Sequence, residues 1–121
     1  MCGMKKFVAP KKNILKLNKL QLRTLALAQV LASDPTTSNK NNETGEVTLL
    51  SVPHPHGNHV HVGRFVVSAR EASGFSNMAV WTALNRKGLA IISDPLTITL
   101  TARGVGYETG LGERFLTESD H

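Results

Sequence analysis

The sequence has a single cysteine, Cys2, among its 121 residues. One cysteine excludes a disulfide or a thiolate metal site within one chain, which fits a reducing cytoplasm. No apolar run approaches the roughly 20 residues of a membrane span. No apolar signal-peptide region follows the N-terminal lysines either. We therefore expect a soluble, unsecreted protein of the cytoplasm.

Aromatic residues are also scarce, at 5% of the chain, whereas 40% of the residues are hydrophobic. This composition indicates an aliphatic core, and the length suits one compact domain with tails. The sequence contains no P-loop, no G-x-G-x-x-G, no G-x-S-x-G and no H-E-x-x-H. It therefore favours a protein that is not an enzyme, although a histidine with a metal-bound water would suffice for hydrolysis in principle.

Acidic residues are missing from the first 19 positions, which hold six lysines: Lys5, Lys6, Lys11, Lys12, Lys16 and Lys19. The net charge of +5 therefore comes from the N-terminus, because the other residues carry eight basic against nine acidic side chains. Pro10 discourages an early helix, so we expect residues 1–13 to be a flexible basic arm. Such an arm can follow nucleic-acid phosphates, bind an acidic partner or only solubilise the chain.

The clearest helix in the sequence is predicted from Leu15 to Ser33, with Asn18 as a capping residue and Asp34-Pro35 beyond its end. Its leucines spread widely around the helix axis, so we expect cover on more than one side. Several elements of one chain or a second subunit can provide that cover, and we favour a homodimer. Residues 36–45 contain no apolar side chain and predict a flexible surface loop.

Residues 67–107 have the pattern of two helices followed by a hairpin. Ser68 and Glu71 have the spacing of a capping box for a first short helix over residues 69–73. Gly74 is then suited to the position that ends this helix.

The second helix of this pattern is predicted over residues 77–87, with Ser76 as its cap and Gly88 as its end. A hairpin follows over residues 89–101, with a turn at Ser93-Asp94-Pro95 and period-two alternation in its second strand. After it, residues 102–107 predict a helical turn weakened by glycine.

The residues from Ala83 to Leu89 (ALNRKGL) and from Leu100 to Gly104 (LTARG) resemble a family phrase. In the winged helix-turn-helix of MarR-like and related prokaryotic regulators it reads approximately L-E-K-K-G-L … L-T-x-x-G. The resemblance covers residues 67–107, about a third of the chain. It implies a DNA-binding transcriptional regulator, with residues 77–87 as recognition helix and 89–101 as wing, and a homodimer that reads two half-sites. The sequence departs from the family in a wing turn without a basic tip.

The second helix has an apolar and a polar side. The apolar side, expected to pack on the first long helix, consists of Met78, Val80, Trp81 and Leu84. The predicted DNA contacts are the polar residues of this helix and the arm: Ser76, Asn77, Thr82, Asn85, Arg86, Lys5, Lys6, Lys11 and Lys12. The polar side can equally be a solvated surface or a protein contact, since many folds serve several functions.

Residues 46–67 are not expected from the family and hold four of the five histidines. Strand-like stretches at residues 47–52 and 59–67 flank a good two-residue turn, Gly57-Asn58. In that register the histidines share one face of a hairpin: His54, His56, His59 and His61. Neutral imidazoles suit zinc or another divalent transition metal. The alternatives are a pH-responsive contact and a phosphate contact made together with Arg64.

The sequence as a whole predicts an α+β fold, a winged helix-turn-helix with an additional β-hairpin (46–67) between the first helix and the helix-turn-helix. Residues 14–107 form the winged-helix-like domain, and residues 108–121 a flexible C-terminal tail. The predicted function is DNA binding in transcriptional regulation. The alternative is a small metal-binding protein that uses the scaffold for protein–protein contact.

Overall fold

A computed structural model describes residues 14–53, 57–63, 65–93, 97–111 and 117–118 of the chain. Over these residues the protein has an α+β fold with two antiparallel sheets. The helices are α1 (Lys19–Ala32), the 3-10 helix η2 (Ser73–Ser76), α2 (Met78–Arg86) and α3 (Ala102–Gly106). The first sheet has the order β1-β2-β6-β5, with β1 Ser38–Lys40, β2 Val47–Leu49, β6 Thr97–Leu100 and β5 Ala90–Ser93. The second has the order β3-β4-β7, with β3 His59–Val62, β4 Phe65–Ser68 and β7 Thr117–Glu118.

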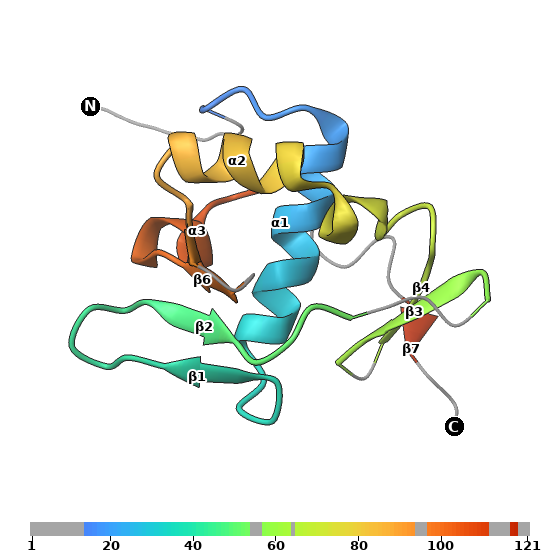
Figure 1. Ribbon diagram of the computed structural model, residues 1–121, viewed down its shortest axis with the longest axis horizontal. Helices are drawn as coiled ribbons and strands as arrows, with labels where there is room; N and C mark the ends of the chain where they lie inside the picture. Colours follow the sequence, from blue (N-terminus) through green and yellow to red (C-terminus); the bar gives the residue numbers. More distant parts are fainter. Residues whose placement is uncertain (1–13, 54–56, 64, 94–96, 112–116, 119–121) are drawn as a thin grey trace, which may run out of the picture.

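Helix α1 runs through the centre of the molecule, with α2 across the top and the β3-β4-β7 sheet at the lower right (Figure 1). Asn18 is its N-cap, as predicted, and forms a complete capping box with Gln21, since each side chain accepts a hydrogen bond from the other's backbone N–H. Its buried residues are Thr24, Leu25, Ala26, Leu27, Ala28 and Leu31. Elements of the same chain cover them, among them α2, η2, β2 and α3. The wide burial therefore needs no second subunit, and the homodimer stays a prediction.

The flexible loop predicted over residues 36–45 is wrong at its centre, because Ser38–Lys40 forms the edge strand β1. Its backbone pairs with β2, with Ser38 opposite Leu49. The Ser38 hydroxyl is buried and donates to the carbonyls of Ala32 (3.1 Å) and Asp34 (2.8 Å) at the end of α1. A strand of polar residues is stable here because its backbone groups and its one buried hydroxyl have partners.

The first helix predicted for the helix-turn-helix, over residues 69–73, is also wrong. Ser68 Oγ accepts a hydrogen bond from Glu71 N at 3.2 Å, as in a cap, but a turn and then the 3-10 helix η2 follow. Gly74 does not end a helix. It is buried within η2, and a Cβ at this position would overlap Thr24 Oγ1 of α1. Gly74 therefore serves the close approach of η2 to α1.

The second predicted helix is found as α2, with two corrections. Its cap is Asn77, whose Oδ1 accepts from Ala79 N at 3.0 Å, and not Ser76. Val80, Trp81 and Leu84 are buried as predicted, and Trp81 Nε1 donates to Phe75 O at 3.0 Å. Met78 is wrongly assigned to this side and is 49% exposed. As the first helical residue, it lies one turn before Thr82 on the outer face.

The hairpin predicted after α2 is confirmed. Strands β5 and β6 pair from Ala90 opposite Leu100 to Ser93 opposite Thr97. Residues 94–96, which hold most of the predicted turn, lie outside the described residues. Strand β6 also pairs with β2, and the helical turn predicted after it is α3, which is capped by Thr101.

The single strand predicted over residues 59–67 is wrong, because it is divided into β3 and β4. Gly63 has a φ of 60°, and β3 and β4 pair with each other across this turn, with His59 opposite Ser68 and Val62 opposite Phe65. Gly57 and Asn58 do form a turn, with a φ of 66° at Gly57. The hairpin predicted over residues 46–67 is wrong in its outer part, because β2 pairs with β1 and β6 in the first sheet while β3 pairs with β4 in the second. Its inner part, the pairing of β3 with residues 54–56, lies outside the described residues.

The C-terminal segment contributes to the second sheet. The predicted tail over residues 108–121 includes β7, a two-residue strand that pairs with β4. Thr109, earlier in the same segment, is buried. At these positions the segment is part of the fold.

Candidate nucleic-acid interface

The residues of the L-T-x-x-G motif meet at the end of α2. The hydroxyl of Thr101 donates to Gly88 O at 2.7 Å and accepts from Gly104 N at 3.0 Å. The backbone N–H of Thr101 donates to Leu89 O at 3.1 Å. Thr101 thus joins the residues after α2 to the first turn of α3. The motif residues have structural roles that place α2, the hairpin and α3 next to one another.

Helix α3 lies closely against this junction. Gly104 is buried, and a Cβ there would overlap the carbonyl oxygen of Leu89. On the other side, Gln29 Nε2 of α1 donates to Gly104 O and to Tyr107 O, both at 2.9 Å. Hydrogen bonds and close packing therefore fix the orientation of α3 relative to α1 and the end of α2.

The outer face of α2 carries three exposed side chains on successive turns, Met78, Thr82 and Arg86. Positions four residues apart lie above one another on a helix. The neighbouring side chains on this face are small, the exposed Ala79 and the half-buried Ala83. A partner can therefore come close to the helix backbone along this face.

The other contacts predicted on α2 and directly before it are exposed as well, but their polar groups form hydrogen bonds within the chain. The Asn77 side chain caps the helix, and Asn85 Nδ2 donates to Ala90 O at 3.0 Å. Ser76 Oγ donates to Ser73 O at 3.3 Å. For Thr82 and Arg86, no side-chain hydrogen bond or ion pair is found within the described residues. These two are the polar side chains most available to a ligand.

Arg103 is a candidate contact that the sequence interpretation missed. Its guanidinium lies beside Gly88, with Nη1 about 3.5 Å from where a Cβ of that glycine would be. Gly88 follows Arg86 and Lys87, so the end of α2 has three basic residues at or beside it. No ion-pair partner for any of them is found in the part of the chain that the structure describes. The available signal was the pair of motif segments, residues 87–89 (KGL) and 100–104 (LTARG). If these two segments are expected to contact each other, Arg103 is expected near Gly88.

The four lysines predicted as arm contacts, Lys5, Lys6, Lys11 and Lys12, lie outside the described residues. The described chain begins at the same end of the molecule as Arg103. Leu15 N donates to the Tyr107 hydroxyl at 3.0 Å, and Tyr107 directly follows α3.

The predicted metal ligands are found only in part, because His54 and His56 lie outside the described residues. His59 and His61 lie together on the outer side of β3, with ring centroids 5.2 Å apart and planes at 80°. Val60 and Val62, between and after them, are buried. Within the described ranges no group of three or more His, Cys, Asp or Glu side chains could hold a metal ion.

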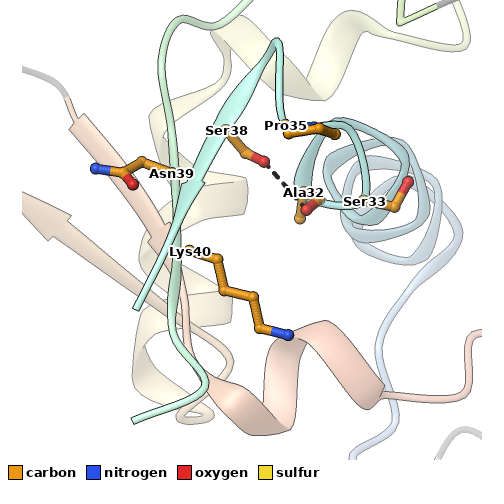
Figure 2. A pocket seen from close by; sticks show the side chains of 6 residues that line it. All are labelled: Ala32, Ser33, Pro35, Ser38, Asn39 and Lys40. Atoms are coloured by element: carbon orange, nitrogen blue, oxygen red, sulfur yellow. Dashed lines mark hydrogen bonds between the residues drawn. The ribbon is translucent and has the colours of Figure 1, made fainter. Parts of the chain in front are cut away.

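A surface hollow of about 350 Å³ lies between the C-terminal end of α1 and β1 (Figure 2). Its lining residues are Ala32, Ser33, Pro35, Ser38, Asn39 and Lys40. The Ser38 hydroxyl inside it is already bonded to Ala32 O, and Lys40 is exposed. The hollow contains no buried charged side chain, so we assign it no function.

Comparisons of the chain with protein-family models, curated proteins and solved structures found no match. The functional argument therefore rests on the chain's own residues. None of the helices in the described ranges has the length and apolar character needed to cross a membrane.

Proposed function

We propose that the protein binds DNA through α2, as the recognition helix of a winged helix-turn-helix in which the 3-10 helix η2 stands in place of the first helix, and that it regulates transcription. The observation that carries the proposal is the outer face of α2, where Met78, Thr82 and Arg86 are exposed beside small side chains. The hairpin β5–β6 follows α2 directly, in the order that the resemblance to MarR-like regulators implies.

The dimensions and chemistry of this face suit a DNA groove. With its side chains an α-helix has a diameter of about 10–12 Å. The major groove is about 12 Å wide and admits an α-helix. Arg86 can donate to guanine or to phosphate, Thr82 can bond base edges, and Met78 can contact a thymine methyl group.

The charge at the end of α2 supports the same function. Arg86 and Lys87 directly precede Gly88, and the Arg103 guanidinium lies beside Gly88, so phosphates flanking a groove-bound helix would meet positive charge there. The lysines of residues 1–13 add four further charges for phosphate contact. We further propose a homodimer, since paired recognition helices read two half-sites about one helical turn apart.

The test is fluorescence anisotropy of the full chain with random duplex DNA over a series of salt concentrations. The logarithm of the association constant falls as the logarithm of the salt concentration rises, and each lost phosphate contact makes this slope less steep by about 0.9. We expect this loss for Arg86→Ala and for Arg103→Ala. Lys40→Ala removes the same charge from β1 and is the matched control, with an unchanged slope.

A second variant separates α2 from the arm. Replacing Lys5, Lys6, Lys11 and Lys12 by glutamine should weaken binding but leave the effects of Arg86→Ala and Thr82→Ala in place. If binding disappears with the four lysines and is indifferent to both α2 variants, attraction by the arm alone explains it and the proposal fails.

A further inference from the structure

The outer face of the β3–β4 hairpin holds the two described histidines side by side. Residues two apart on a strand share a face, so His59 and His61 lie on one side of β3 and the buried Val60 and Val62 on the other. Apolar packing of the valines thus fixes which side the imidazoles take. Because a one-residue slip would expose the valines, the register is strongly specified.

The two imidazoles have the separation that a shared metal ion requires. Their centroids are 5.2 Å apart and their planes are inclined at 80°. Two rings bound through nitrogen to one tetrahedral ion, at about 2.0–2.1 Å each, have centroids roughly 5 Å apart. The separation of the two rings therefore already matches that of a chelated pair, and chelation additionally requires a nitrogen of each ring to point at the ion. An edge-to-face contact also occurs at this separation, so the experiment must distinguish the two.

We propose that His59 and His61 chelate one divalent transition-metal ion of the zinc, nickel and copper class. His59 is half-buried and His61 is exposed, so water can reach the ion and complete its coordination. Neutral imidazole suits this class, whereas Mg²⁺ and Ca²⁺ prefer oxygen ligands. Affinity should follow the general order for divalent metals, with Cu²⁺ bound most tightly.

This site is independent of the proposed DNA contact. It lies on the β3-β4-β7 sheet at the lower right of Figure 1, whereas α2 crosses the top. Metal affinity is measured without DNA, so failure of the metal site and failure of DNA binding are separate results.

The first experiment is isothermal titration calorimetry of the full chain with Zn²⁺ and with Ni²⁺, with Mg²⁺ as the metal control. We expect one ion per chain for Zn²⁺ and Ni²⁺ and no binding of Mg²⁺. His59→Gln and His61→Gln should each weaken binding roughly tenfold or more, because each removes one of two chelating ligands. The double variant His54→Gln/His56→Gln is the matched control and should keep the affinity within about twofold. Circular dichroism shows whether each variant is folded.

A gain of affinity provides the sharper test. Ser68 is exposed and lies directly opposite His59 across the antiparallel pair, where side chains are close neighbours. Ser68→His adds a third imidazole on the same face and should tighten Zn²⁺ binding roughly tenfold or more. Asn39→His adds the same side chain to β1 and should change nothing.

Two results would overturn the proposal. In one, the affinity for Zn²⁺ and Ni²⁺ is unchanged in both single variants or is lost only in His54→Gln/His56→Gln. In the other, Ser68→His folds but binds no more tightly than the unaltered chain.

Discussion

The α2 end and the β3–β4 end of the molecule present their candidate ligand-binding side chains in different ways. At the α2 end, the motif residues Thr101 and Gly104 have internal partners, and Thr82 and Arg86 are exposed on the helix that they support. At the β3–β4 end, the conspicuous sequence residues are themselves at the surface, as with His61. The motif residues at the α2 end therefore hold the candidate contacts in place, whereas the histidines at the β3–β4 end are themselves the candidate ligands.

The two ends also differ in how firmly they are held. The α2 end is fixed by α1, by the hairpin and by α3, through Gln29 and the junction at Leu89. The β3–β4 hairpin has its own ladder and adds Val60, Val62 and Val67 to the core, but among the described residues it makes fewer contacts with α1 than α2 does. Regions with few tertiary contacts open more easily. Substitutions in the support of α2 should accordingly destabilise the whole fold, whereas a ligand on β3 should stabilise it.

The largest effect is expected for Gly104→Ala. The added Cβ would overlap the carbonyl oxygen of Leu89, a backbone atom that cannot rotate away. Overpacking of this kind costs about 1–3 kcal/mol, and here we expect the upper part of that range. Urea denaturation followed by fluorescence of Trp81, the only tryptophan, measures the free energy of unfolding.

Gly106→Ala is the matched control, two residues further along the same helix. A Cβ at Gly106 would meet no atom within 4 Å, so this change should be neutral or stabilising by about 0.5–1 kcal/mol through helix propensity. Equal losses of stability in the two variants would show that the contact with Leu89 is not the cause.

The sequence predicted those elements whose signals are local. Asn18 caps α1 through its own capping box, Gly88 ends α2 with a φ of 79°, and the hairpin after α2 follows from alternation. Each of these signals depends on residues within a few positions of one another. These three features could therefore be predicted without knowledge of any tertiary contact.

The cap of α2 was a local error, whereas the following errors come from contacts outside each predicted segment. The helix expected over residues 69–73 is replaced by a turn and η2, and Gly74 lies against Thr24, 50 positions earlier in the sequence. Strand β1 forms because β2 pairs with it and the end of α1 accepts the Ser38 hydroxyl. Arg103 was missed for the same reason, since its proximity to Gly88 depends on the whole hairpin between them.

An intermediate effect is expected from zinc on thermal stability. A ligand that binds only the folded state stabilises it by about 1.4 kcal/mol at a free concentration ten times its Kd. Thermal unfolding of the full chain should therefore shift upward with Zn²⁺, and the double variant His59→Gln/His61→Gln should not respond. Gly104→Ala should keep the shift, because the two ends are separate. Loss of the zinc response in Gly104→Ala, provided that it is folded at the start of the melt, would show that the ends are coupled.

The smallest effect concerns Asp34, which follows the C-terminal end of α1. Its carboxylate accepts from the Thr36 hydroxyl at 2.7 Å and from Thr36 N at 2.8 Å, and its other oxygen lies near Gly63 of the β3–β4 turn. The hydrogen bond from the Thr36 hydroxyl, followed by that from the Thr36 backbone, holds the pKa of Asp34 below its ordinary value of 3.8. A carboxylate with a lowered folded-state pKa stabilises the fold above its unfolded-state pKa, and this contribution is lost as the pH falls through the folded-state pKa.

Asp34→Asn should therefore melt at a slightly lower temperature than the unaltered chain at pH 7. The difference should shrink as the pH falls below 3.8 and through the lower folded-state pKa of Asp34, because the carboxyl group then becomes protonated in both states. Thr36→Val keeps the backbone N–H bond and should show the same pH dependence with a smaller amplitude. Thermal melts from pH 2 to pH 7 measure both. A difference in melting temperature that stays constant across this range would contradict the prediction. It would mean that the charge of Asp34 does not contribute to stability, and that the variant is destabilised only through a changed turn after α1.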